Sequence, residues 1–321
     1  MNTLNHHYPI LLPHDDGNPP RGVVCAANEA RFTSAHFSEP LTAFSVGWSD
    51  PSDLAGLLDF VAPPIPVGRR FEFKKADNAE AFLSETDDVR AIGAAFKRVE
   101  YSGTSVNEKT VNKGLTIRVD HDDVVGEDWA ERYTTLLMQR LLRNELRRAL
   151  TALDAAASSS NQTWNSSSNP DADVRAALTD AADSSGVRPN RLLFGEAAWN
   201  LRAEAYDAQE VGGALRLASL SPDELAAKLM LEGVRVAGAR YQDAAASKAG
   251  IVGSSVYAFY AQDGLTKDEP SNLKRFVTPA EGGGNFRVYL EEHSKFTDLS
   301  VEHYSTIVAT STLGVAELAV S

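Results

Sequence analysis

A stripe of large apolar residues with helical spacing dominates the middle of the chain. Between Glu127 and Ala157 these residues recur every three or four positions (Trp129, Tyr133, Leu137, Leu141, Leu142, Leu146, Leu150 and Leu153), which is the period of a helix with one buried face. Acidic residues open the segment and arginines crowd its second half, an order that complements the helix dipole. About 30 residues at 1.5 Å each predict a rod about 45 Å long. Such a rod favours an elongated plate over a compact enzyme.

The first 66 residues are expected to form an extended arm. Nine of the fourteen prolines lie there, and proline fixes φ and lacks an amide donor. Only the piece from Ser52 to Phe60 has helical spacing. Large apolar residues recur along the arm, which argues against pure disorder. We therefore predict an arm without a core of its own that lies on another surface, with a disordered tail as the alternative.

Residues 67–122 predict a charged two-stranded ribbon. Phe71 and Phe73 alternate with charged residues, and residues 115–120 alternate in the same way, which is the period of a strand. A short helical piece at 84–96 and a polar tip at 102–109 are expected between the two strands. A two-stranded ribbon is marginally stable alone in water, so we expect it to dock on a neighbouring subunit. A surface hairpin of one compact domain is the alternative.

An α/β block and a long hairpin are predicted for the rest of the chain. Residues 158–169, rich in Ser and Asn, are expected to form a loop. Helices and short apolar strands then alternate over about 100 residues, the pattern of a small α/β domain. The expected helices run from Asn169-Pro170 to Gly186, over 196–206, and from the capping box Ser221–Glu224 to a stop at Gly233; the expected strands are 192–194, 234–236 and 256–260. Residues 286–290 and 299–308 alternate as two long strands, about 35 Å in length, that could lie along the rod.

Composition and charge exclude several classes of protein. The 321 residues include 31 basic and 44 acidic side chains, a net charge of −13, without a cluster of five Lys or Arg, so high-affinity nucleic-acid binding is not expected. An acidic surface can still face packaged DNA. The single cysteine, Cys25, forms no intramolecular disulfide. The first 20 residues lack a signal-peptide pattern and no apolar run approaches 18 residues, so we expect no export and no membrane span.

Signatures of catalysis are absent from the sequence. It contains no P-loop, no G-x-G-x-x-G after a strand, no G-x-S-x-G and no H-E-x-x-H. His121 clusters with Asp120, Asp122 and Asp123 directly before the rod, where helix capping explains the acids better than a metal ion does. A second cluster (His6, His7, His14, Asp15 and Asp16) is expected to be solvated surface. We therefore assign no catalytic, cofactor-binding or metal-binding residue and predict that the chain is not an enzyme.

The order arm, ribbon, rod, α/β block and long hairpin resembles the Hong Kong 97 fold of tailed-phage major capsid proteins, an α+β fold. Three segments are similar to that family in sequence: Ile117–Asp120 running into Asp128-Trp129, Pro189–Gly195 followed by Ala198–Arg202, and Phe286–Leu290 through Tyr304–Val308. The resemblance implies an N-arm (1–66), an E-loop (67–122), a P-domain with the spine helix (123–170 and 277–311) and an A-domain (171–276 and 312–321).

The same resemblance implies a structural function. The chain would be a major capsid subunit that forms hexamers and pentamers in an icosahedral virion head, assembled in the host cytoplasm around double-stranded DNA without sequence-specific binding. Scaffolding, portal and decoration proteins are further implied partners, with no cofactor and no membrane. Some family members crosslink subunits through a Lys–Asn bond, for which Lys109 or Lys113 and Asn285 or Asn272 are candidates here. An encapsulin-like compartment, a cytosolic oligomeric enzyme and a tail or decoration protein are the alternatives.

Overall fold

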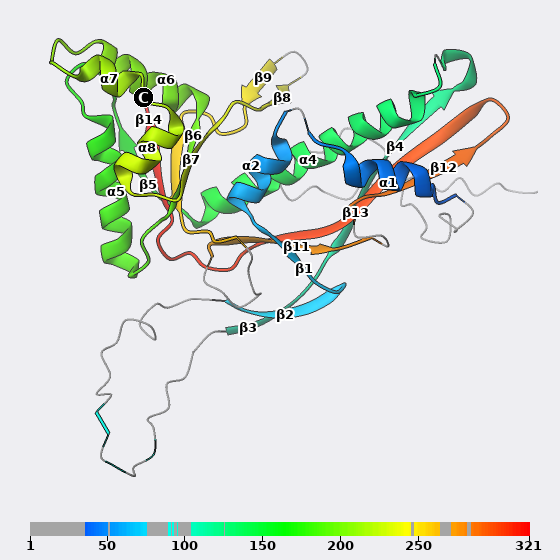
Figure 1. Cartoon of the computed structure of the whole chain (residues 1–321), viewed down its shortest axis with the longest axis horizontal. Helices are drawn as coiled ribbons and strands as arrows, with labels where there is room; N and C mark the ends of the chain where they lie inside the picture. Colours follow the sequence, from blue (N-terminus) through cyan, green and yellow to red (C-terminus); the bar gives the residue numbers. More distant parts are fainter. Residues whose placement is uncertain are drawn as a thin grey trace, which may run out of the picture.

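The predicted rod is present as one uninterrupted helix in the computed structural model, which describes residues 36–50, 52–75, 89–90, 92, 95, 104–124, 126–244, 247–263, 271–280 and 284–321. Helix α4 spans Trp129–Ala156, 28 residues, and is therefore about 42 Å long. It lies along a five-stranded sheet, and a second sheet covered by helices stands at its C-terminal end (Figure 1). The mixed α+β class is confirmed.

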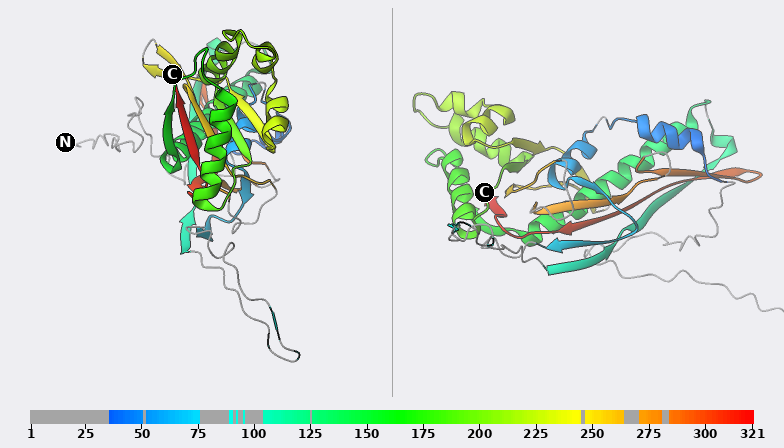
Figure 2. Two further views of the ribbon diagram at one scale, coloured as in Figure 1. Left: turned by 90° about the vertical axis from the view of Figure 1, so that its left-hand side faces the viewer. Right: turned by 60° about the horizontal axis from the view of Figure 1, so that its bottom comes forward.

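The first sheet is built around one long strand. Strand β13 (Phe296–Ala309) pairs with β12 (Arg287–Glu292) and β11 (Leu273–Thr278), which follow each other along one of its edges, and with β4 (Val111–Asp120) along the opposite edge. Strand β1 (Pro64–Pro66) continues the sheet beyond β11 in parallel. The predicted long hairpin is thus confirmed as β12–β13. We call helix α4 together with this sheet the plate, and the right-hand view of Figure 2 shows its strands running along the helix.

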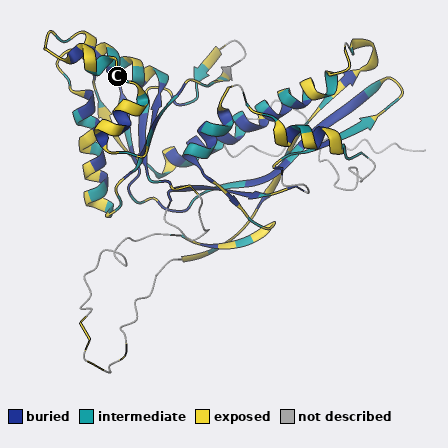
Figure 3. Cartoon of the chain, viewed as in Figure 1, coloured by how far each residue is buried: buried dark blue, intermediate teal, exposed yellow. Residues whose placement is uncertain are grey.

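The apolar stripe of α4 forms the core of the plate. Leu137, Met138 and Leu141 pack against Val288, Leu299 and Val301 of the sheet. One helical face and one sheet face are thus buried against each other. Further along α4, Leu146 and Leu153 join a second cluster that reaches Leu193 and Phe259 of the other sheet. Figure 3 shows the buried face of α4 turned toward the strands, with exposed residues on its outer side.

The ribbon differs from the sequence prediction in its second strand. Strand β2 (Arg70–Lys75) pairs with β3 (Thr104–Lys109), whereas residues 111–120 form β4 of the plate. Leu115 and Ile117 pack into the core beside α4, so burial in the larger sheet outweighs pairing in an isolated ribbon. The sequence predicts a polar tip where β3 lies, because the segment TSVNEK has one apolar side chain and lacks the alternation of apolar and polar residues that indicates a strand. The predicted helix at 84–96, like Cys25, lies outside the described residues, apart from single positions of that helix.

The second sheet and its helices form the predicted α/β block. Its strand order is β5 (Ser158–Gln162), β14 (Ala316–Val320), β10 (Ser255–Phe259), β6 (Arg191–Gly195) and β7 (Gly233–Ala237). Helices α5 (Pro170–Ser185), α6 (Glu196–Asp207) and α8 (Pro222–Leu229) pack on one face of this sheet, and α7 (Ala214–Ala218) lies beside α6. The other face packs on α2 and α4. The left-hand view of Figure 2 shows the helices together with the sheet. A small hairpin, β8 (Arg240–Ala244) and β9 (Ser247–Gly250), follows β7. We call this unit the block.

Local signals predicted the first residues of α5, α6 and α8 correctly, whereas α7 was not predicted. Asn169 caps α5 and Gly186 ends it in the left-handed conformation, and Ser221 with Glu224 forms the predicted capping box of α8. Helix α8 ends earlier than predicted, because Met230 adopts the left-handed C-cap at φ 55° and Gly233 already belongs to β7. Residues 158–162, predicted as a loop, form β5, whose polar side chains are mostly exposed beside β14.

Two further differences concern the borders of the predicted parts. Strand β11 crosses the expected boundary between residues 276 and 277 and pairs with β13, so residues 273–276 belong to the plate. The arm contains a helix that its prolines concealed, α1 (Glu39–Gly47), where Pro40 sits in the first turn and Ser38 caps the amide of Leu41. Helix α2 (Leu54–Val61) follows and packs on α4. From residue 36 onward the described arm is thus part of the plate's core.

The buried stripe of α4 generates a stability test. Leu146→Ala is expected to lower the free energy of unfolding by about 2–5 kcal/mol, because Leu146 is fully buried and its truncation leaves a cavity. Leu136→Ala is the matched control on the same helix; its side chain is 51% exposed, and the expected change is below about 0.5 kcal/mol. Chemical denaturation measures both. Equal losses for the two variants would show that the helix packs by another face.

Candidate assembly surfaces and their buried supports

A buried carboxylate attaches α4 to the sheet of the plate. Glu145, 2% exposed, accepts hydrogen bonds from Lys113 Nζ of β4 (2.7 Å), from Arg148 Nη1 (2.7 Å) and from Ser305 Oγ of β13 (2.7 Å). A glutamate within the apolar stripe, between Leu142 and Leu146, is the sequence signal that could have revealed it. The Lys113–Glu145 pair therefore joins the helix to β4 in an otherwise apolar interface.

The surrounding charges keep Glu145 ionised. Burial raises the pKa of this carboxyl, but contacts with His303 and Lys113 outweigh burial and hold the pKa well below its ordinary value. His303 Nε2 lies 3.7 Å from Glu145 Oε1, which is beyond hydrogen-bond distance. Burial also lowers the pKa of Lys113 and of His303, and the Glu145 carboxylate offsets this only in part. The cluster is a structural Lys113–Glu145 ion pair with the buried imidazole of His303 beside it.

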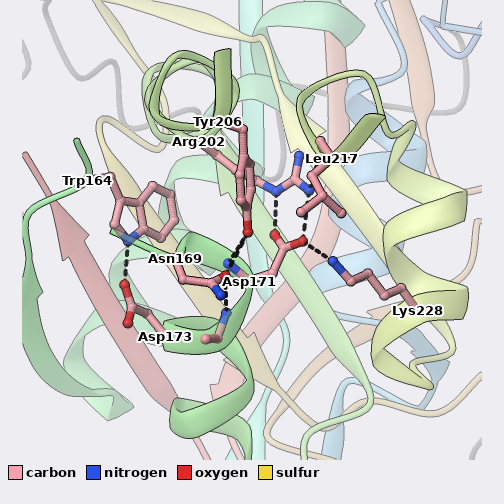
Figure 4. Close-up of polar contacts among 9 residues, drawn as sticks. Trp164, Asn169, Asp171, Asp173, Arg202, Tyr206, Leu217 and Lys228 are labelled. Carbon is pink, nitrogen blue, oxygen red and sulfur yellow. Dashed lines mark hydrogen bonds and ion pairs between the residues drawn. The ribbon is translucent and has the colours of Figure 1, made fainter. Parts of the chain in front are cut away.

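A second buried network orders the block, as Figure 4 shows. Asp171 in the first turn of α5 accepts two hydrogen bonds from Arg202 of α6 (2.7 and 3.1 Å) and one from Lys228 of α8 (2.7 Å). Burial raises the pKa of Asp171, but these hydrogen bonds outweigh it, so the pKa is lowered. Tyr206 accepts from the amide of Asp171 and donates to Asn169 Oδ1. One aspartate thus ties three helices together.

This network also supports an exposed apolar segment at the outer end of the block. Residues 209–218, here called the apex loop, are a turn followed by the short helix α7. Arg202 Nη2 donates to the carbonyl of Leu217 in α7 (3.1 Å). Val211 and Leu215 within this loop are 69% and 72% exposed. Large apolar side chains held in water by a rigid support favour a contact with another molecule. The sequence marks this loop only by the pair Gly212-Gly213.

The ribbon is a second exposed surface, on a different part of the molecule (Figure 1). Phe71 and Phe73 hold β2 to the plate, with their rings 4.3 and 5.3 Å from the ring of Phe276. Almost all of β3 is exposed, and in the described part of the chain each ribbon strand pairs with the other alone. An outer strand edge offers backbone donors and acceptors to a further chain. The ribbon is thus packed against the plate through β2, while the edge of β3 is exposed to a binding partner.

The structure separates the crosslink candidates into two kinds. The ammonium of Lys113 donates a hydrogen bond to Glu145. Asn272 is fully buried; its side-chain oxygen accepts from Tyr260 N (2.5 Å), and its side-chain nitrogen donates to the carbonyls of Leu313 (2.7 Å) and Ser311 (3.2 Å). Both are structural residues. Lys109 at the end of β3 and Asn285 before β12 are exposed. They lie on different elements, and their pairing stays a prediction.

One of the acids near His121, Asp120, caps a different helix from the one predicted. Residues His121–Asp123 form a short 3-10 helix, η2, in which Asp120 Oδ1 accepts from the amide of Asp122 (3.0 Å). Helix α4 itself begins after Asp128, without a side-chain cap. His121 Nε2 lies 3.0 Å from Thr297 Oγ1. The prediction of a capping role was therefore correct, but the capped helix is η2 and not α4.

Comparison with solved structures identifies a shared fold. A phage-related protein from Bordetella bronchiseptica RB50 is similar with a TM-score of 0.65 and 22% sequence identity, over 88% of this chain and 96% of that chain. The capsid of cyanophage P-SCSP1u gives a TM-score of 0.49 at 6% identity, covering 82% and 87% of the two chains. The satellite phage P4 procapsid gives 0.48 at 8% identity, covering 88% and 99%. No family model and no curated protein sequence matches the chain.

The first of these likenesses shows that the chain has the fold of a phage-related protein. It extends over nearly the whole of that protein, so plate and block belong to one shared architecture. Among the described residues, no helix combines the length and apolar character needed to cross a membrane. The division into named capsid parts stays a prediction.

The Lys113–Glu145 pair generates the second test. Glu145→Ala is expected to lower the free energy of unfolding by about 3–5 kcal/mol, because it leaves a buried ammonium without its partner. Glu131→Ala, on the exposed first turn of the same helix, should change it by less than about 1 kcal/mol. Adding Lys113→Met to Glu145→Leu should recover part of the loss, since an apolar pair can replace a buried ion pair. A loss for Glu145→Ala no larger than for Glu131→Ala would contradict the role of this pair.

Proposed function

We propose that this chain is the major capsid subunit of a tailed bacteriophage. The observation that carries the proposal is the ribbon, which is rooted in the plate by phenylalanines while its outer strand faces solvent. A folded subunit with an exposed strand edge presents unpaired backbone donors and acceptors that another chain can bind. The fold shared with a phage-related protein supports a phage origin for that contact.

The named parts of the Hong Kong 97 fold apply to this chain as follows. Residues 1–66 are the N-arm, 67–109 the E-loop ribbon, and α4 the spine helix. The P-domain is the plate, which gains β4 and β11 relative to the boundaries expected from sequence and is joined by β1 at the end of the N-arm. It loses β5, which pairs with β14 of the block. The A-domain is the block, including the returning strand β14. The pairing of β4 with β13 supports this revision.

Two exposed surfaces on one molecule suit a closed shell. In a ring, the apex loop of one subunit contacts a different surface of the next, a heterologous contact that closes after a fixed number of copies. We infer that apex loops meet at the centres of pentamers and hexamers and that ribbons lie over adjacent subunits. Each contact is small, but several contacts per subunit raise the effective concentration of the others. Weak surfaces can therefore build a stable shell.

The remaining features of the proposal follow from charge and class. With a net charge of −13, the chain faces packaged double-stranded DNA without binding its sequence. The proposed location is the virion head, assembled in the host cytoplasm with scaffolding, portal and decoration proteins. The role is structural and needs no cofactor. An encapsulin-like shell is the second candidate, because such a shell would be built from subunits of the same fold; the content of the shell separates the two.

The apex loop generates the third test. Leu215→Asp is expected to abolish rings and shells while leaving the melting temperature nearly unchanged, because Leu215 is 72% exposed in the subunit and its charge would be buried only in the assembly. Thr179→Asp adds the same charge to the exposed face of α5 in the same block and should assemble as the parent does. Analytical ultracentrifugation with electron microscopy measures both. Normal assembly of Leu215→Asp would contradict the proposed ring contact.

A further inference from the structure

A cluster of three metal-binding side chains lies at the turn of the β12–β13 hairpin. Glu291 stands near the end of β12, His293 in the turn and Asp298 near the start of β13. One ligand atom from each lies within 4.8 Å of the others. This turn is at the end of the plate away from the block (Figure 1), so the cluster is separate from the ribbon and the apex loop.

The register of the hairpin places two carboxylates opposite each other. Glu291 and Asp298 are direct partners in the antiparallel ladder, an arrangement of like charges that destabilises a sheet. On the other side of β13, Arg118 donates two hydrogen bonds of 2.8 Å to Asp298. Its guanidinium also lies 3.8 Å from the centre of the Phe296 ring. The positive charge of Arg118 balances the charge of the Asp298 carboxylate. The two paired carboxylates still concentrate negative charge at this turn, and a bound divalent cation would stabilise that arrangement.

The imidazole of His293 is fixed toward this pair. Its ring lies against Phe296, with centroids 4.5 Å apart, and its backbone amide donates to the carbonyl of Phe296 (2.9 Å). The side chain is 34% exposed and Nε2 faces Glu291; the Nε2 atom itself is shielded from solvent and makes no hydrogen bond to any described residue. A buried nitrogen in this state costs free energy unless a partner satisfies it, and a neutral imidazole nitrogen is a common metal ligand.

One ligand distance and the set of donor atoms fit a zinc-like ion. In a tetrahedral zinc site, bonds of about 2.1 Å put two ligand atoms about 3.4 Å apart. Glu291 Oε1 and His293 Nε2 are separated by 3.4 Å. Magnesium and calcium prefer sets of oxygen ligands, whereas one imidazole with two carboxylates suits zinc and its first-row neighbours.

We propose that Glu291, His293 and Asp298 bind one zinc-like divalent transition-metal ion at the tip of the plate. Three protein ligands leave a fourth coordination position for water. The bound ion joins the end of β12, the turn and the start of β13, and so stabilises the folded hairpin against fraying. This inference does not depend on the capsid proposal.

The test uses the full chain in a background that removes the other histidine-rich segment. His6, His7 and His14 are replaced by alanine in every variant, and zinc chloride is titrated by isothermal calorimetry into metal-free protein. The parent is expected to bind one zinc ion saturably and to melt at a higher temperature with zinc than with a chelator. His293→Ala and Glu291→Gln should each weaken binding by about tenfold or more, since even outer-shell changes cost about 10- to 100-fold.

His121→Ala is the matched control. His121 lies on the adjoining η2 turn and contacts Thr297, so its loss should leave the zinc affinity unchanged. Melting temperatures without metal verify that each variant is folded. The proposal is overturned by absence of saturable binding in the parent, by equal affinity of His293→Ala and the parent, or by loss of binding in His121→Ala.

Discussion

The attachment of α4 to β13 and β4 is the constraint on which the rest of the structure depends. Leucines along one face of the helix supply most of the burial, and Glu145 adds a directional contact with Lys113 and Ser305 at one point of that interface. A rod about 42 Å long cannot bury a whole face in a small globule, so a strand of 14 residues runs beside it. The plate is elongated because its longest helix and its longest strand have matching lengths.

The proposed function follows from two surfaces that the subunit leaves exposed. The ribbon is rooted in the plate through Phe276, and the apex loop is held through Arg202 at the outer end of the block. Both surfaces are supported by buried contacts, and we therefore expect them to keep their geometry in the free subunit. Preorganised surfaces lose less conformational entropy on association, which favours assembly through many small contacts.

The sequence predicted those features that depend on neighbouring residues. The stripe of α4, the cap at Asn169 and the box at Ser221 are local signals, and each helix begins within two residues of its expected position. The hairpin β12–β13 was also predictable, because both strands alternate and follow each other along the chain.

Features that depend on distant residues were not predictable in the same way. Strand β4 pairs with β13 about 180 residues later in the chain, and no local pattern separates this pairing from a ribbon with β2. Strands β3 and β5 are polar on nearly every position, so the usual alternation is missing. The Glu291, His293 and Asp298 cluster likewise needs the register of the hairpin, which sets the two carboxylates opposite each other.

Electron microscopy of the purified full-length chain over a range of concentrations tests the central claim most directly. The account predicts pentameric and hexameric rings or closed shells, with ribbon density lying over the adjacent subunit. A chain that stays monomeric at every concentration, with the ribbon folded back on its own block, would contradict it.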